Sequence, residues 1–171
     1  MSKRIFFFLC AAAALAAETT AIRAGRLVDP ESGQVTQNQV ILVEDGRVLM
    51  IGPNLQVPIP TDAAVIDLTQ YSVLPGLVDA HNHLALTYKR DPENNSYYLT
   101  SVLDSTAIRA IQAVSNGITM MSSGFTVVRD LGNAGNYADS ALRIAIDQGW
   151  VPGPTVINSC IIIGGFGGQF H

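Results

Sequence analysis

Two histidines one residue apart, His81 and His83, follow an apolar run in the stretch LPGLVDAHNHL, residues 74–84. Side chains two positions apart in an extended chain point to the same side, so both imidazoles can converge while Asn82 points away. Imidazole is a ligand for zinc and related transition metals. Two ligands fall short of the three in a catalytic zinc site, so the pair is either part of a metal site or two solvated loop histidines.

Three further side chains are candidates for supporting or substrate-binding roles. Asp79 precedes the histidines with the same parity along the strand, and we expect it to support them rather than bind metal. Asp130 could orient a ligand, but Arg129 beside it makes a structural ion pair an equal alternative. His171 is either a hydrogen-bond donor toward a substrate or an exposed terminal residue.

Residues 21–75 have the pattern of short strands, without helical periodicity. Within QVILVEDGRVLMIG, Asp45-Gly46 separates two apolar runs, which predicts a hairpin with a two-residue type I′ turn. The segment GPNLQVPIP contains three prolines and is predicted to be a loop. This part of the chain is therefore predicted to form a small all-β subdomain.

The pattern changes at Gly76 to strand, helix, strand, helix, strand. The strands are GLVDAH, FTVVRD and TVINS, and the helices are expected from about Leu99 to Met121 and in YADSALRIAIDQG. GLVDAH lacks clean alternation, which predicts a strand buried on both faces. The order predicts parallel βα units in a (β/α)8 barrel or a doubly wound sheet, where functional residues gather at the carboxyl ends of the strands.

The amino terminus predicts export. Lys3 and Arg4 precede an apolar run from Ile5 to Ala17, which makes residues 1–17 a signal peptide and the mature protein periplasmic or secreted. The run is too short for a membrane span of about 20 residues. Cleavage would leave Cys160 as the remaining cysteine, without a partner for an internal disulfide.

Composition limits the classes of function. Hydrophobic residues make up 48% of the chain and charged residues 14%, which is typical of a globular protein with a substantial core. The net charge is −4, and no run of more than two Lys/Arg residues occurs, so nucleic-acid binding is not expected. The sequence gives no indication of the oligomeric state.

PGLVDAHNHL closely resembles the first-strand signature of the amidohydrolase superfamily, P-G-[LF]-[IV]-D-x-H-x-H. Upstream, ILVEDGRVLMIGP and VIDLTQYSVLPG are similar to the β-unit that these enzymes place before the barrel. Downstream, GFTVVRDLGN and GPTVINSCIIIGGFGGQFH resemble the second- and third-strand regions of the imidazolonepropionase and Xaa-Pro dipeptidase branch.

The resemblance implies an α/β fold with a (β/α)8 barrel that holds one or two divalent metals, usually zinc. His81 and His83 would bind the more buried metal, and His171 would face a small amide or dipeptide substrate. Metal-activated water would then attack the amide carbonyl. The early strands, residues 21–75, would form part of a composite β-sandwich.

Residues 76–171 provide roughly three βα units of about 30 residues each, whereas a closed barrel needs about 250 residues. The family's carboxylated lysine, its later histidines and its catalytic aspartate come from strands beyond these units. We therefore expect an N-terminal fragment of a longer hydrolase, inactive and prone to aggregation alone, whose general base lies beyond residue 171. The alternatives are a non-catalytic truncated remnant and a ring deaminase of the same superfamily.

Overall fold

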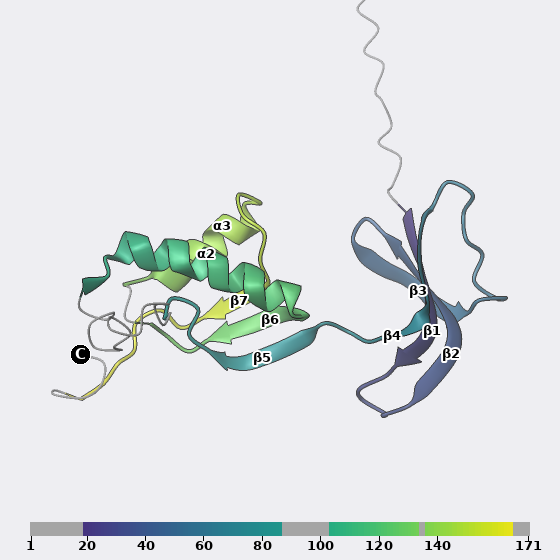
Figure 1. Cartoon of the computed structure of the whole chain (residues 1–171), viewed down its shortest axis with the longest axis horizontal. Helices are drawn as coiled ribbons and strands as arrows, with labels where there is room; N and C mark the ends of the chain where they lie inside the picture. Colours follow the sequence, from purple (N-terminus) through teal and green to yellow (C-terminus); the bar gives the residue numbers. More distant parts are fainter. Residues whose placement is uncertain (1–18, 87–102, 134–135, 166–171) are drawn as a thin grey trace, which may run out of the picture. The chain divides into compact units, whose positions relative to one another are not determined.

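A computed structural model of the chain describes residues 19–86, 103–133 and 136–165. The chain divides into two compact units, Met1–Pro75 and Gly76–His171 (Figure 1). Among the described residues, no helix is long and apolar enough to span a membrane. Residues 1–17, where the signal peptide is predicted, lie outside the described part.

The first unit is a four-stranded sheet with the order β3-β2-β1-β4. β1 pairs antiparallel with β2 and parallel with β4, and β2 pairs antiparallel with β3. All elements described in this unit are strands: β1 (Thr19–Val28), β2 (Val35–Glu44), β3 (Arg47–Pro53) and β4 (Ala64–Val73).

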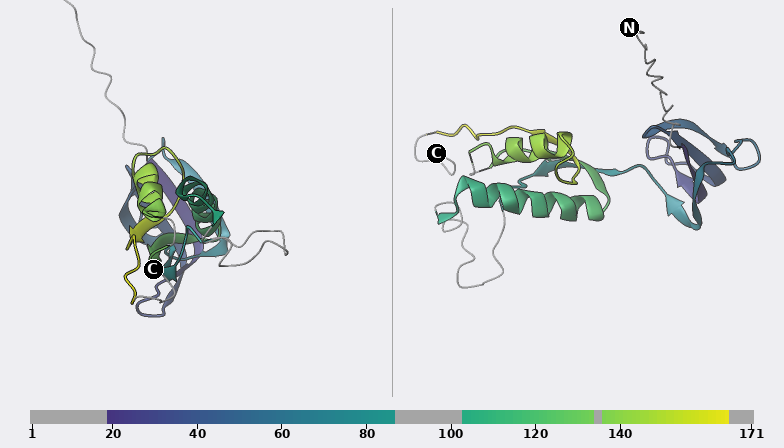
Figure 2. Two further views of the ribbon diagram at one scale, coloured as in Figure 1. Left: turned by 90° about the vertical axis from the view of Figure 1, so that its left-hand side faces the viewer. Right: turned by 90° about the horizontal axis from the view of Figure 1, so that it is seen from above.

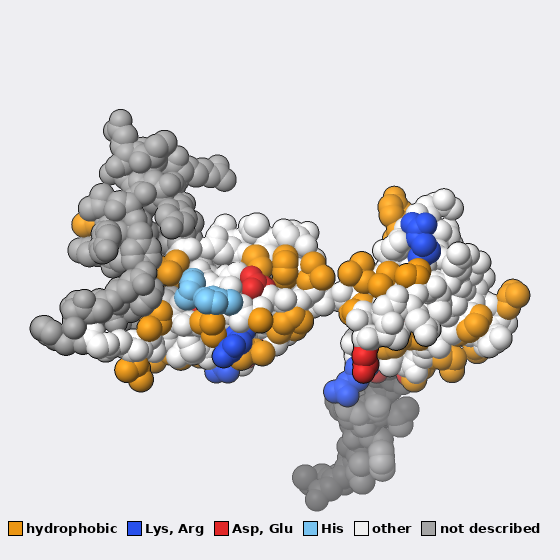
Figure 3. All heavy atoms as spheres, turned by 90° about the horizontal axis from the view of Figure 1, so that it is seen from below, with side chains coloured by type: hydrophobic (Ala, Val, Ile, Leu, Met, Phe, Trp, Pro, Cys, Tyr) orange, Lys and Arg blue, Asp and Glu red, His pale blue; other side chains and the backbone are white. Residues whose placement is uncertain are grey.

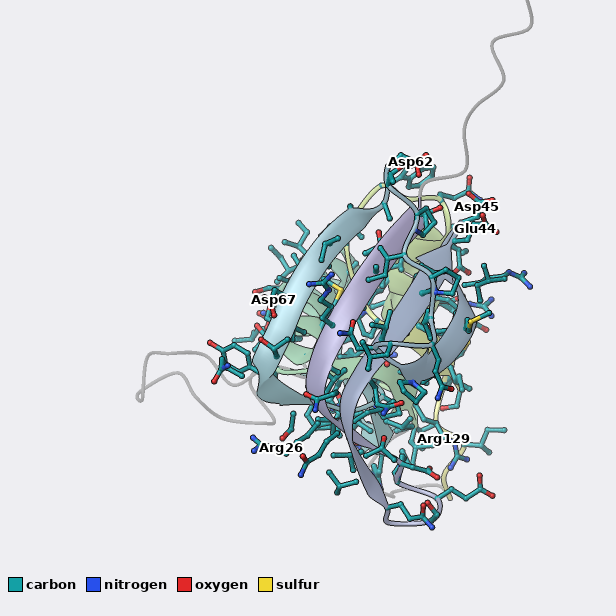
Figure 4. The ribbon with its side chains drawn as sticks, turned by 90° about the vertical axis from the view of Figure 1, so that its right-hand side faces the viewer. Arg26, Glu44, Asp45, Asp62, Asp67 and Arg129 are labelled. Carbon is teal, nitrogen blue, oxygen red and sulfur yellow. The ribbon has the colours of Figure 1, made fainter. Side chains whose placement is uncertain are left out.

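The turn between β2 and β3 has positive φ at both central residues, 48° at Asp45 and 72° at Gly46, which confirms the predicted type I′ geometry. Figure 4 looks onto this sheet, with Asp45 at the hairpin turn and Arg26 toward the other end of the strands. There the Nε atom of Arg26 donates to Ser72 Oγ at 2.8 Å. Small and branched side chains form the core: Ala21, Val40, Leu42 and Val57.

The second unit is a three-stranded sheet with the order β5-β6-β7, and both strand pairs are parallel. Two helices alternate with its strands along the chain, as the sequence predicts, so the unit is a mixed α/β structure. Its elements are β5 (Leu77–Asn82), α2 (Thr106–Ser122), β6 (Phe125–Asp130), α3 (Ala138–Asp147) and β7 (Thr155–Asn158).

Both helices lie on the same face of this sheet (Figure 2). Between the helices and the sheet lies an apolar core: Leu84, Ala85, Ala113, Val128, Ala138, Leu142 and Val156. Val78 is 63% exposed and Ile157 55% exposed on the other face. The prediction that β5 is buried on both faces is therefore wrong for the described residues, because the helices cover one face and leave the other open.

The first predicted helix is not continuous within the described residues, because Asp104 and Ser105 are not helical. α2 begins at Thr106, after Ser105, whose Oγ accepts a hydrogen bond from the Ile108 amide at 3.3 Å. A serine before the first turn is a preferred helix start, because its hydroxyl oxygen satisfies an amide that has no partner within the helix. The predicted start near Leu99 lies outside the described residues.

Candidate metal centre

The histidine pair lies where β5 ends. His81 is the penultimate residue of the strand, and His83 comes directly after its last residue. A hydrogen bond of 3.0 Å from the Leu86 amide to the His83 carbonyl closes the turn that follows. The pair thus occupies the carboxyl edge of a parallel sheet, where ligand sites of α/β proteins gather.

The structure brings the two imidazoles together. Their ring centroids lie 5.3 Å apart, with an angle of 78° between the ring planes. His81 is exposed and His83 half-buried. Figure 3, which views the unit from the side away from the helices, shows the histidine side chains as one patch among hydrophobic side chains. Two imidazoles bound to one tetrahedral zinc at about 2 Å place their centroids about 5 Å apart, so the observed spacing suits a shared metal ion.

His83 is oriented by a main-chain carbonyl. Its Nδ1 atom lies 2.6 Å from the Gly132 oxygen, a distance at which Nδ1–H donates and Nε2 keeps a free lone pair. Metal-binding histidines usually hold their second ring nitrogen in this way. Gly132 has φ +106°, and a Cβ at this position would clash with the Ile162 side chain, so the approach to His83 requires glycine.

Asp79 contacts the main chain of the histidine segment rather than an imidazole. One of its oxygens accepts from the His81 amide at 3.1 Å, and the other accepts from Asn82 Nδ2 at 2.7 Å. The hydrogen bonds from Asn82 and His81 hold the pKa of Asp79 below its ordinary value. Asn82 also approaches Met120 Sδ at 4.0 Å, so its side chain faces α2. An ionised Asp79 thus holds the His81 amide and the side chain of Asn82, the residue between the two candidate ligands.

Asp130 is fully buried at the end of β6. Its carboxylate accepts from the Leu84 amide at 2.8 Å and from the Gly132 amide at 2.9 Å. Burial, with a smaller contribution from the charge of Asp139, raises the pKa of Asp130 to about 6, against the opposing effects of the hydrogen bonds from these two amides and of His83. Arg129 is exposed, and neighbouring strand residues point to opposite faces, so Asp130 bonds to main-chain amides on the buried side.

Asn116 and Asp139 were not predicted from the sequence. Asn116, on α2, donates from Nδ2 to the Leu84 carbonyl at 2.8 Å. Asp139, fully buried in the first turn of α3, accepts from the Cys160 amide at 2.8 Å and from the Ser140 amide at the same distance. Asn116 thus anchors the segment after β5, and Asp139 anchors the segment after β7. The sequence did contain a signal for Asp139, because an aspartate in the first turn of a helix is a favoured position. No local pattern indicated a role for Asn116.

The remaining predicted residue, His171, lies outside the described residues. Within residues 19–86, 103–133 and 136–165, no group of three or more His, Cys, Asp or Glu side chains is placed to hold a metal ion. The donor set of His81 and His83 therefore fits a transition metal as two ligands of an incomplete site. The described residues thus bring together two candidate ligands and the groups that orient them.

Parallel strands alternate with helices, and two imidazoles lie together at the carboxyl edge of their sheet, which defines an α/β protein with a pair of candidate metal ligands. The chain belongs to the amidohydrolase family, whose model matches residues 72–163. The family resemblance predicted from the sequence is confirmed. A dihydroorotase of Mycobacterium tuberculosis is 33% identical over 116 residues, which cover 68% of this chain and 22% of that protein. A dihydroorotase of Citrifermentans bemidjiense is 42% identical over 73 residues, 41% of this chain and 16% of that protein.

Solved structures agree with this assignment. A Xaa-Pro dipeptidase with bound methionine matches with a TM-score of 0.70 and 28% identity, over 82% of this chain and 33% of that chain. A prolidase complexed with N-methylphosphonate-L-proline matches with a TM-score of 0.73 and 26% identity, over 88% of this chain and 34% of that chain. The chain thus spans about a third of these structures and about a fifth of the curated relatives.

Proposed function

We propose that this chain supplies the first part of a metal-dependent hydrolase that cleaves carbon–nitrogen bonds of small substrates. The observation that carries the proposal is the convergence of His81 and His83 at 5.3 Å, with His83 Nδ1 engaged by a carbonyl. Membership of the amidohydrolase family supports the type of reaction.

In this proposal His81 and His83 hold a divalent metal ion, most simply zinc, with one or two ions in the complete centre. When bound, the ion supplies Lewis-acid polarisation of the scissile carbonyl and acidifies water. The chain's own residues preorganise the ligands. Asp79 holds the His81 amide, and Asp130 holds the turn after His83 to the end of β6. These contacts lower the cost of ordering the ligands when the metal binds.

We infer that the other ligands and the general base belong to a longer protein. The chain spans only 22% of a dihydroorotase and 33% of a Xaa-Pro dipeptidase structure, which supports this inference. The open face of the β5-β6-β7 sheet carries exposed Val78 and Ile157, as expected for strands that are covered in a completed (β/α)8 barrel. The first unit would likewise be part of a composite β-sandwich.

The proposed substrates are small amides or dipeptides, linear or cyclic. The names of the relatives, dihydroorotase and Xaa-Pro dipeptidase, support a small substrate with a carbon–nitrogen bond. His171 is proposed as a hydrogen-bond donor toward that substrate. We also propose export to the periplasm or medium through residues 1–17, because Lys3 and Arg4 precede the apolar run from Ile5 to Ala17.

The test uses a longer protein that contains this chain and the rest of the barrel. Bound metal would be quantified, and hydrolysis of dipeptides and cyclic amides assayed, for His81→Ala and His83→Ala. The matched control is Arg143→Ala, at an exposed position on α3. Loss of metal and of hydrolysis in both histidine variants, with neither lost in the control, supports the proposal. Full metal content in the histidine variants would overturn it.

A further inference from the structure

The turn after His83 is held by side chains from two different elements, and both act on the main chain of Leu84. The Leu84 amide donates to Asp130 Oδ2 at 2.8 Å, at the end of β6. The Leu84 carbonyl accepts from Asn116 Nδ2 at 2.8 Å, on α2. Both polar groups of one residue are thus satisfied by side chains that lie 14 positions apart in the sequence.

The side chain of Leu84 completes the restraint. It is 1% exposed, the following Ala85 is fully buried, and both belong to the core between the helices and the sheet. Leu84 is therefore fixed through its side chain, its amide and its carbonyl. His81, by contrast, is exposed at the end of β5. The residue next to His83 is thus held at three points.

The restrained residue adjoins His83, whose ring contacts the Gly132 oxygen. Asp130 bonds to Leu84 with one oxygen and to Gly132 with the other, so it sets the main chain on both sides of the His83–Gly132 contact. The His83–Leu84 peptide is held at both of its polar groups, because its carbonyl accepts from the Leu86 amide at 3.0 Å and its amide donates to Asp130. The bond from Asn116 to the Leu84 carbonyl holds the next peptide, Leu84–Ala85, so consecutive peptides are fixed directly after His83, whose Nδ1 lies 2.6 Å from the Gly132 oxygen.

We propose that Asn116 is a positioning residue for His83. Acting through the Leu84 carbonyl, it holds the imidazole in the Nδ1–H tautomer, so that Nε2 is the nitrogen presented to a metal ion. In this proposal Asn116 acts through its bond to the Leu84 carbonyl, not as a ligand of the metal or the substrate. The metal part of this inference rests on the proposed function, whereas the control of ring geometry and tautomer does not.

The test compares two matched substitutions on α2. Asn116→Asp keeps the size of the side chain and replaces the donor that faces the Leu84 carbonyl with an acceptor. Gln112→Glu makes the same amide-to-carboxylate change one turn earlier, where Nε2 contacts Asp104 at 3.4 Å and not Leu84. Asn116→Ala removes the donor without adding charge and serves if the aspartate variant does not fold.

The first readout is the nitrogen-15 spectrum of the imidazoles in the metal-free chain at mildly alkaline pH, which contains three histidines. We expect a single Nδ1–H tautomer for His83 in the parent and in Gln112→Glu, and an averaged mixture of tautomers in Asn116→Asp and Asn116→Ala. An unchanged Nδ1–H signature in both Asn116 variants, even with a lowered melting temperature, would overturn the proposal and leave Asn116 a packing residue.

The second readout is a Zn²⁺ titration of the same proteins. Substitution of a residue that orients a metal-binding histidine typically weakens metal affinity 10- to 100-fold. We therefore expect zinc affinity to be about tenfold weaker in the Asn116 variants than in Gln112→Glu. A disturbed tautomer together with unchanged zinc affinity would uphold the positioning of His83 and overturn its proposed metal role. The two readouts thus separate a failure of this inference from a failure of the proposed function.

Discussion

Replacing the buried Asp130 with asparagine should change how stability depends on pH. Burial raises the pKa of this carboxyl from its ordinary value of 3.8 to about 6 in the folded protein. Between these values the folded chain keeps a proton that the unfolded chain has released. The free energy of unfolding therefore falls as the pH rises through this window: the stabilising contribution is complete below 3.8 and is lost above about 6.

The size of the effect follows from the difference between the two pKa values. It corresponds to at most about 3 kcal/mol of unfolding free energy for the metal-free protein. In Asp130→Asn this contribution disappears, because the amide does not titrate. The asparagine offers one acceptor oxygen to the two amides of Leu84 and Gly132, so we also expect a pH-independent loss of about 1–3 kcal/mol.

The assay is urea unfolding followed by circular dichroism at several pH values between 4 and 7. The control is Asp67→Asn, an exposed carboxyl whose pKa is lowered by the hydrogen bonds from Thr69. The lowered pKa of Asp67 stabilises the folded protein at high pH, and this contribution is lost on acidification. Asp67→Asn removes only that contribution, so the variant should keep the fall in stability with rising pH that Asp130 causes. An identical pH dependence in the parent and in Asp130→Asn would refute the reasoning.

Three further predictions concern the ligand turn, the core and the amino terminus. Gly132→Ala should lower the unfolding free energy by about 1–3 kcal/mol, because alanine is strained at φ +106° and its Cβ clashes with Ile162; chemical denaturation measures the loss, and an unchanged value would contradict it. Leu142→Ala should cost about 2–5 kcal/mol, because Leu142 is 2% exposed in the core, whereas the exposed Arg143→Ala should change stability little. Mass spectrometry of protein recovered from the periplasm or medium should show a chain that lacks residues 1–17; an intact Met1 in that fraction would contradict export.

The features that could be predicted from the sequence are local. The type I′ turn at Asp45-Gly46 depends on two adjacent residues, and the alternation of strands and helices after Gly76 depends on short patterns. The position of His81 and His83 at a strand end follows from the same order of elements. In each case a few neighbouring residues determine the conformation, so no knowledge of tertiary packing is required.

The groups that hold the site depend on packing between distant segments. The bond from Asn116 to the Leu84 carbonyl exists because one turn of α2 passes over the turn after β5, which no local pattern indicates. The role of Asp130 was partly accessible: alternation along a strand places Asp130 and Arg129 on opposite faces, which argues against an ion pair between them. The bonds of Asp130 to the Leu84 and Gly132 amides could not be predicted from the sequence, because they depend on how two strand ends meet.

The central claim, that His81 and His83 bind one metal ion, is tested most directly by crystals of the protein grown with Zn²⁺ and measured at the zinc absorption edge. We expect one anomalous peak about 2 Å from Nε2 of His83 and from a ring nitrogen of His81. The His83 Nδ1 contact with the Gly132 oxygen should be unchanged at 2.6 Å. A peak bound elsewhere, or two ordered imidazoles without a peak between them in the presence of excess zinc, would contradict the claim.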